Sequence, residues 1–532
     1  MGDKKQSKYQ ERNSIFSVFI SNSIKTLSCL YLTFLKIMML QNIKNRLDII
    51  SVLLLIMTMG LLHSPTVLGG DQSLFVIISQ LLDSGKILYK DLFDYKQPGI
   101  YLFYLLAGKT LGWSDVSIHL FELGYWILFS ILLFYTIRSY SLFRADYLNS
   151  LLPLFIVGSY YCNATIFHLT QLEALINVPL FLMVWLLDRA YKTGNALFVT
   201  YLTIGVLIGV ILLSKLVFAP IIFFFLLIHF IFTLRSQSLK YILVKQIIPL
   251  FVGFVIPLSI FLAYVFTHQI ENLVVDIYFK IPTSVITLAD QIDPDRLLSS
   301  IKWFIKQMLA LLLLAVIGVF LITKKESHFF SLIIAWGVIG FGVILMQKTS
   351  WWSYHFQLLY VPIGVFAVMG LDFVLYHLLR KIKLGTPLIK GLLIITIISL
   401  IFSNQLNTLW KGVVPQGDNK GYTFDYAKND AENIINVIKP EDTIFICGNP
   451  RMYLLTSHLP ELSTNGWILE YYLDYQWEDF YDQFKNKLPT YLFVKNEYDK
   501  LIESKQAKLW ELMMKEYTEI DSVKNGKWYK RI

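Results

Sequence analysis

Charge is scarce in this chain of 532 residues. Lys, Arg, Asp and Glu together make up 16% of the sequence, whereas a soluble globular protein carries roughly 25%. Hydrophobic residues make up 55%, and the mean hydropathy is +0.54. This composition excludes a disordered chain and an ordinary soluble enzyme, and it is typical of a protein that folds in a lipid bilayer.

Cysteine is nearly absent, and the few cysteines follow no pattern. Cys29, Cys162 and Cys447 have unrelated spacings, which predict neither a disulfide framework nor a metal site. The sequence also lacks a G-x-G-x-x-G loop, a Walker loop and an H-E-x-x-H motif. A disulfide-stapled secreted module is therefore excluded, and no common nucleotide or zinc signature indicates the chemistry.

Long hydrophobic runs are the main feature that is present. Because a helix needs about 20 mostly apolar residues to cross a bilayer, we predict about eleven membrane spans and a polytopic α-helical fold. The predicted spans lie near residues 48–64, 117–137, 147–162, 172–187, 196–213, 216–234, 246–266, 304–322, 329–346, 356–379 and 391–409.

Basic residues gather in every second connection between these spans. Five such connections hold 13 Lys and Arg against three Asp and Glu. The positive-inside rule makes these connections cytoplasmic, so we expect the N-terminus inside and the C-terminal part outside. The net charge of +9 then reflects orientation in the membrane, and we expect no nucleic-acid partner.

The first 47 residues are basic, and their apolar stretch is interrupted by Lys25 and Lys36. This interruption does not fit a cleaved signal peptide. One interpretation is an amphipathic helix on the inner leaflet. The other is that translation begins at Met38 or Met39, so that residues 1–37 do not belong to the product.

Residues 411–532 have the composition of a small soluble α/β domain, which we expect to follow a transmembrane domain of residues 48–410. The apolar runs 443–447 and 491–494 predict buried strands, and Asn525-Gly526 predicts a hairpin turn. Amphipathic stretches predict helices at residues 425–438, 476–487 and 497–515. No motif in this domain indicates an activity.

Two connections on the predicted outer face are long, residues 65–116 and 267–303, and long segments of this kind are usually functional. In the first, residues 70–84 are apolar on one face and predict a surface helix that stops at Gly85. Pro98 suits the first turn of a second surface helix.

The segment between these two helices resembles a known family. Residues 85–102 read G-x-I-L-Y-x-D-x-F-D-x-K-x-P-G-I-Y-L, downstream of Asp71 near the membrane. This pattern resembles the first external loop of the GT-C superfamily of polytopic glycosyltransferases. That superfamily includes protein O-mannosyltransferases, the lipid A aminoarabinose transferase and rhizobial lipopolysaccharide galacturonosyltransferases. Gln97 is one departure, because the family more often has a second proline there.

Three further features are similar to this superfamily. They are the number of spans together with an external C-terminal domain, the run Gln171-x-Glu173 after the third span, and Trp352-Ser-Tyr354-His355 before the tenth. The resemblance implies a GT-C fold and inverting transfer of a sugar from a polyprenyl-phosphate donor. The acceptor would be an envelope lipid, glycan or protein, on the extracytoplasmic face of a bacterial-type plasma (inner) membrane.

The resemblance also implies roles for individual residues. Asp71 would be the general base that takes the acceptor proton, and Lys96 would stabilise the leaving phosphate. Further candidates are Asp91 and Asp94 for catalysis, Tyr89 and Lys215 for phosphate binding, and Gln171, Glu173, Tyr354 and His355 elsewhere in the site. We expect no cofactor or dedicated metal site, although clustered aspartates leave a divalent ion possible.

Each candidate also has a structural interpretation. Asp71 could cap its helix, and Lys96 could extend to the lipid headgroups. Asp91 and Asp94 could cap turns or pair with Lys90. The other candidates could be structural as well: Glu173 at a solvated span end, Tyr354 and His355 in the interfacial aromatic belt, and Lys215 in a plain turn.

Other functional classes remain open. A transporter or lipid flippase would bury ionisable groups at mid-membrane and show repeated halves. Glu122 is the clearest such charge, and we find no internal repeat. An envelope polysaccharide polymerase or ligase would have its large external loop late in the chain, and a scaffold would not need so many acids in one loop.

Overall fold

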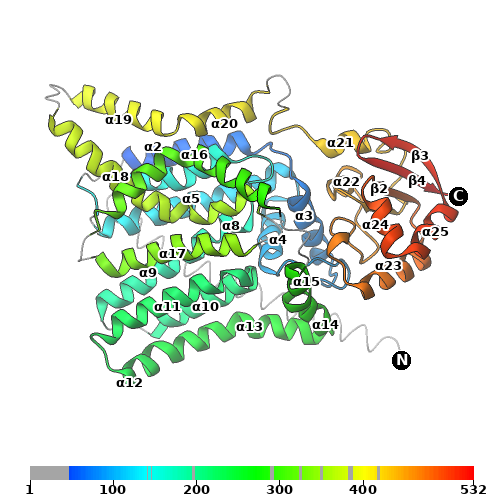
Figure 1. The fold of residues 1–532 in the computed structure, drawn as a ribbon, viewed down its shortest axis with the longest axis horizontal. Helices are drawn as coiled ribbons and strands as arrows, with labels where there is room; N and C mark the ends of the chain where they lie inside the picture. Colours follow the sequence, from blue (N-terminus) through cyan, green and yellow to red (C-terminus); the bar gives the residue numbers. More distant parts are fainter. Residues whose placement is uncertain are drawn as a thin grey trace.

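The computed structural model describes residues 47–140, 142–144, 147–194, 198–287, 293–322, 326–347, 351–381, 387–415 and 420–532. A bundle of long helices carries a small domain with a β-sheet at one end (Figure 1). The predicted inner-leaflet helix, Met38 and Met39 lie outside the described residues.

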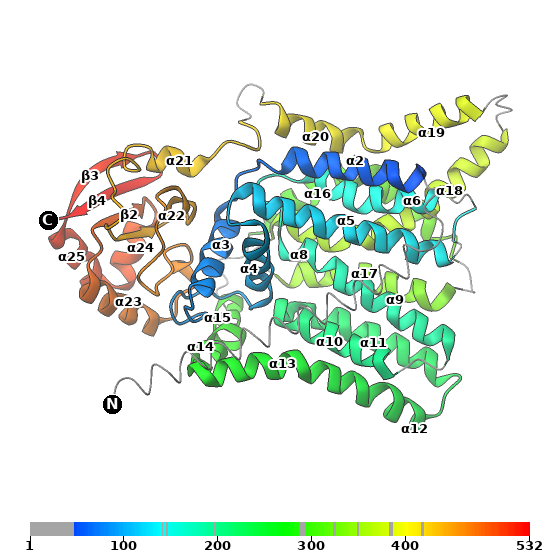
Figure 2. The ribbon, with the colours of Figure 1, turned by 180° about the vertical axis from the view of Figure 1, so that it is seen from behind.

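Apolar helices run close to parallel through the bundle, as Figures 1 and 2 show from opposite sides. They are α2 (Leu47–His63), α5 (Asp115–Tyr140), α9 (Asn177–Thr193), α10 (Phe198–Ser214), α11 (Ala219–Leu234), α13 (Ile248–His268), α16 (Pro294–Val319), α17 (Ser327–Met346) and α18 (Tyr360–Lys381). Helices α10 and α13 pack closely at Gly205. A Cβ at this position would lie 2.0 Å from the Leu250 carbonyl oxygen, so only glycine permits this approach.

Shorter segments connect or extend these helices. They are α6 (Leu148–Pro153), η2 (Leu154–Gly158), α7 (Ser159–Asn163), α8 (Leu172–Leu175), η3 (Leu216–Phe218), α12 (Leu239–Ile242), η4 (Leu243–Ile247), α14 (Glu271–Val275), η5 (Asp276–Lys280), α15 (Ile281–Thr287), η8 (Ser353–Leu359), α19 (Pro387–Ile401) and α20 (Ser403–Val413). Helix α12, the last turn of α18 and the first turn of α19 lie at the end of the bundle away from the sheet domain (Figure 1).

Among the described residues, seven helices are long and apolar enough to cross a membrane, or eight if one bent pair counts as a span. The predicted span 147–162 is divided into α6, η2 and α7, with Pro153 inside the first piece. The predicted span 391–409 is bent by 67° between α19 and α20. Helices α2 and α10 are apolar but have only 17 residues each. The total of eleven spans and their orientation therefore stay predictions.

The C-terminal domain has the predicted mixture of helices and strands. Its helices are α21 (Tyr426–Ala431), α22 (Arg451–Leu455), η9 (Leu469–Tyr471), α23 (Asp474–Lys487), α24 (Tyr498–Lys505) and α25 (Ala507–Glu516). Its strands β1 (Ile444–Cys447), β2 (Tyr491–Lys495), β3 (Tyr517–Val523) and β4 (Gly526–Arg531) form one sheet in the order β1-β2-β4-β3. β1 and β2 are parallel, and the other two pairs are antiparallel. Both predicted strands and the hairpin at Asn525-Gly526 are confirmed.

Two helices, α3 (Gly70–Asp83) and α4 (Gly99–Leu111), lie between the bundle and the C-terminal domain in both views (Figures 1 and 2). Most residues of α3 are buried there, and not only those of its apolar face, so it is not the exposed surface helix that the sequence predicted. The first stops before Gly85, whose φ is +86°, and the second starts directly after Pro98. Both predicted boundaries are confirmed.

A guanidinium joins the C-terminal domain to the bundle. Arg451 donates two hydrogen bonds to the Asp115 carboxylate at 2.6 and 2.7 Å and one to Asp425 at 2.8 Å. Asp115 is the first residue of α5, so this fork holds the C-terminal domain against one end of a bundle helix. The domain is thereby positioned directly over α3 and the loop that follows it.

Candidate active site

Asp71 lies in the first turn of α3 at the junction of the two domains. The helix N-cap is Gly69, so Asp71 is inside the helix and is not its cap. Its Oδ1 accepts a hydrogen bond from the indole N–H of Trp467 at 2.9 Å. The side chain is 27% exposed, so the carboxylate is partly shielded but still reachable.

Lys96 turns inward toward Asp71, so it does not extend to a headgroup. Its Nζ lies 3.6 Å from Asp71 Oδ1 and 3.9 Å from Asp94 Oδ1. It also lies 4.8 Å from the ring centre of Tyr95 and 5.2 Å from that of Phe75. Burial opposes the charge, but Asp71 and Asp94 outweigh it and raise the pKa of Lys96 above its usual range. Lys96 is therefore an ammonium ion.

The buried ammonium of Lys96 has no hydrogen-bond partner within the described part of the chain. An ammonium has three N–H donors, and leaving such donors unpaired inside a protein is costly. The site therefore has unused capacity for an anionic oxygen close to Asp71.

The other candidates of this loop, Tyr89, Asp91 and Asp94, form hydrogen bonds that hold the loop in its conformation. The Tyr89 hydroxyl donates to the Lys96 carbonyl oxygen at 2.9 Å, and Asp91 accepts from the backbone N–H of Ile87 at 2.6 Å. Asp94 is fully buried and accepts from the hydroxyl of Tyr101 at 2.5 Å. Burial raises the pKa of Asp94. Tyr89 and Asp91 therefore bind backbone groups, and only Asp94 also approaches the Lys96 ammonium.

A second charged cluster contains the candidates that follow α7. Glu173 Oε1 lies 2.6 Å from Lys215 Nζ and 3.5 Å from His355 Nε2. Lys215 also donates to Gln347 Oε1 at 2.6 Å. Glu173 is buried, so it does not lie at a solvated span end.

Tyr354 lies beside His355 of the second cluster. Its ring meets that of His355 edge-on, with 4.6 Å between the ring centres, and it lies within electrostatic reach of both Asp71 and Glu173. Gln171, by contrast, donates to the carbonyl oxygen of Phe167 at 3.1 Å and supports its own loop. The structure thus brings Asp71, Lys96, Glu173, Lys215, Tyr354 and His355 to one region.

Glu122 has a role that the sequence did not indicate. It is buried and accepts hydrogen bonds from the hydroxyl of Tyr160 and, at 2.8 Å, from the backbone N–H of Thr170. Thr170 has a left-handed backbone with φ +53°. Gln72 of α3 holds the same loop by donating to two of its carbonyl oxygens, each at 2.9 Å. Glu122 therefore fixes the loop that leads to Glu173.

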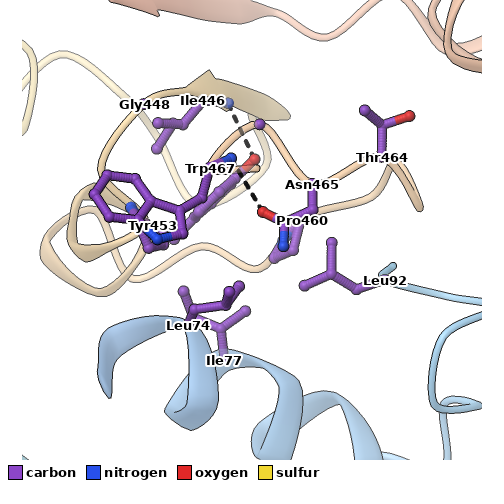
Figure 3. A pocket seen from close by; sticks show the side chains of 12 residues that line it. Leu74, Ile77, Leu92, Ile446, Gly448, Tyr453, Pro460, Thr464, Asn465 and Trp467 are labelled. Carbon is purple, nitrogen blue, oxygen red and sulfur yellow. Dashed lines mark hydrogen bonds between the residues drawn. The ribbon is translucent and has the colours of Figure 1, made fainter. Parts of the chain in front are cut away.

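The C-terminal domain contributes one wall of the site, which sequence reasoning did not predict. Figure 3 shows Leu74 and Ile77 of α3 facing Tyr453, Asn465 and Trp467 of the C-terminal domain. The space between them holds about 10 Å³, which is enough for one water molecule. Apart from this small space, the two domains are in direct contact along α3.

The same segment of the C-terminal domain also contacts the loop after α3. The backbone N–H of Phe93 donates to the carbonyl oxygen of Ser463 at 2.8 Å. The rings of Tyr471 and Tyr95 lie 5.1 Å apart between centres. Aromatic side chains from both domains therefore surround the Asp71–Lys96 pair.

No group of three or more His, Cys, Asp or Glu side chains among the described residues converges as metal ligands would. The site in the described ranges is composed of three carboxylates, two lysine side chains, the His355 imidazole and several aromatic rings.

The long-helix bundle, the charged loop at its end and the small sheet domain that covers this loop together define a polytopic helical membrane protein. No family model and no curated protein matches the sequence. The chain is, however, similar in structure to ArnT from Cupriavidus metallidurans. The TM-score is 0.52 for the apo state and 0.53 for the state bound to undecaprenyl phosphate. In both comparisons the identity is 12%, and 91% of this chain and 97% of the other are covered. The expected GT-C fold is confirmed.

Proposed function

We propose that this protein is a GT-C glycosyltransferase that moves a sugar from a polyprenyl-phosphate donor to an envelope acceptor on the extracytoplasmic face of the membrane. The observation that carries the proposal is the buried Lys96 ammonium, without a hydrogen-bond partner among the described residues, 3.6 Å from the Asp71 carboxylate. Such a transfer needs a carboxylate to take the acceptor proton and, close to it, a cation to neutralise the leaving phosphate.

In the proposed reaction, an acceptor hydroxyl or amine attacks the anomeric carbon of the donor. The bond from that carbon to the phosphate oxygen breaks with its electron pair, and the phosphate leaves with an added negative charge. Asp71 takes the proton of the nucleophile, and Lys96 neutralises the departing phosphate. Attack opposite the leaving group inverts the anomeric centre.

The donor class is supported by the similar fold of ArnT, which has been observed with undecaprenyl phosphate. The position of the site supports it too, because α3 and the loop after it, which carry Asp71 and Lys96, lie where the bundle meets the C-terminal domain, at the end of the apolar helices (Figure 1). A lipid phosphate whose tail lies along these helices would reach Lys96. We assign the second cluster, Glu173 with Lys215 and His355, to holding the sugar or the acceptor.

A transporter is the main competing function. In the sequence, the feature that most favoured a transporter was Glu122, an ionisable residue inside a predicted span. In the structure this buried carboxylate accepts a backbone N–H and a tyrosine hydroxyl on Oε1, and its Oε2 lies 3.4 Å from His119 Nδ1. Such a group is a loop anchor and not an ion-pathway residue, so the transferase is favoured.

One experiment separates these two functions. The purified protein in lipid nanodiscs is incubated with polyprenyl-phosphate sugars that carry a radiolabel in the sugar, together with an extract of envelope lipids and glycans. A transferase releases unlabelled polyprenyl phosphate and labels the acceptor. In sealed vesicles, a flippase would move the intact donor across the bilayer with its sugar-phosphate bond unbroken, and this outcome would refute the proposal.

A further inference from the structure

Trp467 of the C-terminal domain makes the shortest side-chain contact to the proposed base. Its indole Nε1 donates to Asp71 Oδ1 at 2.9 Å, although 396 positions separate the two residues in the chain. A hydrogen bond to a charged acceptor is stronger than one between neutral groups. The contact is therefore strong enough to orient the carboxylate.

The C-terminal domain holds this indole in place through its backbone. The N–H of Trp467 donates to Asn465 Oδ1 at 3.1 Å, and its carbonyl oxygen accepts from the Tyr498 hydroxyl at 3.1 Å. The preceding Gly466 lies against β1 so closely that a Cβ would be 2.1 Å from the Ile446 carbonyl oxygen. These contacts preorganise Trp467 independently of Asp71.

Helix α3 is shaped to receive the same ring. A Cβ on Gly70 would lie 2.5 Å from Cζ2 and 2.8 Å from Cη2 of Trp467. Any other residue at position 70 would therefore push the indole away from Asp71. The fit between Gly70 and Trp467 is an observation separate from the hydrogen bond, and it points to the same contact.

We propose that Trp467 is a positioning residue for sugar transfer, so that the C-terminal domain forms part of the catalytic unit. The proposal rests on the function assigned to Asp71 above. By holding Oδ1, the indole N–H leaves Oδ2 of Asp71 to take the proton of the acceptor. Lys96 keeps its own contacts with Asp71 and Asp94 and does not depend on the indole.

The first test is Trp467→Phe, which keeps an aromatic ring but removes the N–H donor. We expect kcat to fall about 10- to 100-fold, while KM for the donor changes less than about twofold because the phosphate site is intact. Trp410→Phe is the matched control, since Trp410 is 58% exposed on α20. An unchanged kcat in Trp467→Phe, with Asp71→Asn inactive, would overturn the proposal and leave the proposed function standing.

The second test asks whether Gly70 acts through the indole. Gly70→Ala should lower kcat in the wild-type background, where the added Cβ displaces Trp467. It should add little in a Trp467→Ala background, where the ring is gone, so the two changes are non-additive. Gly124→Ala is the control, because a Cβ there meets no atom within 4 Å. Fully additive losses would contradict the proposal.

The third test does not require activity. The protein is labelled with 5-fluorotryptophan, and the fluorine resonance of residue 467 is assigned by its loss in Trp467→Phe. Asp71→Ala should shift this resonance, and Asp83→Ala should not. An unshifted resonance would show that the contact does not form, whereas a shifted resonance in a protein that transfers no sugar would place the failure with the proposed function.

Discussion

Lys96 and Asp71 form an inward-facing ion pair, with 3.6 Å between Nζ and Oδ1. The same segment of the chain contains a second pair, Lys109 with Asp83, at 2.8 Å. The side chains of the second pair are 57% and 36% exposed, and exposed ion pairs contribute little to stability. The molecule therefore provides its own matched controls for the two proposed catalytic residues.

Lys96→Ala should raise KM for the polyprenyl-phosphate donor about 10- to 100-fold, because a charge-assisted hydrogen bond to the phosphate is lost. Lys109→Ala should change it less than about twofold. Steady-state rates measured over a range of donor concentrations check both variants. A Lys96→Ala protein with the donor dependence of the wild type would remove Lys96 from the phosphate site.

Lys215→Met should destabilise the protein by about 3 kcal/mol, because it leaves the buried Glu173 without its principal counter-charge. Glu173→Gln combined with Lys215→Met should recover most of this loss, since neither charge then remains unpaired. If the pair also holds a substrate, the double variant will be stable but poorly active. Thermal unfolding and turnover, measured on the wild type and both variants, separate these effects. A stable single Lys215→Met variant would contradict the prediction.

Arg451→Lys should loosen the C-terminal domain, because lysine cannot reproduce the forked contact with Asp115. We expect a loss of about 1–3 kcal/mol in docking and faster release of the domain by limited proteolysis. Arg531→Lys is the control, since Arg531 bonds the Leu488 carbonyl oxygen within the C-terminal domain. Equal proteolysis rates for the two variants would argue against the docking role.

His168 should make stability depend on pH. It is buried between the Thr165 hydroxyl at 2.6 Å and the Ser353 hydroxyl at 2.8 Å, and burial lowers its pKa from 6.5 to about 4. Because the folded-state pKa lies below the unfolded value, its stabilising contribution is complete above pH 6.5. That contribution is lost as the pH falls toward 4, by up to about 1.4 kcal/mol per pH unit.

The comparison with His168→Gln isolates this effect from other titrating groups. The difference in unfolding temperature between wild type and variant should shrink as the pH falls from 6.5 to 4. A constant difference across this range would show that His168 does not titrate as its burial requires.

Local features of the site were predictable because their signals lie within a few residues. Gly85 marks the end of α3 through its positive φ, and Pro98 marks the start of α4. The loop between them carries the pattern that resembles the GT-C superfamily, and it contains Lys96. The same resemblance identified Asp71 as a candidate, but only the structure shows that Asp71 and Lys96 form an ion pair.

Contacts between distant segments were not predictable from this sequence. Trp467 reaches Asp71 from the other domain, and no feature around position 467 indicates a catalytic neighbour. Lys215 bonds both Glu173 and Gln347 because α10 and α17 end, and α8 begins, at one place. Glu122 suggested transport by its position in an apolar run, and its backbone partner at Thr170 is visible only in three dimensions.

The most direct test of the central claim compares Asp71→Asn with Asp83→Asn in the release of polyprenyl phosphate by purified protein. Both changes remove one carboxylate from α3, and only the first removes the proposed base. We predict that Asp71→Asn lowers the rate about 10²- to 10⁴-fold, with normal membrane insertion, and that Asp83→Asn keeps the wild-type rate. An Asp71→Asn protein that releases polyprenyl phosphate at the wild-type rate would contradict the account.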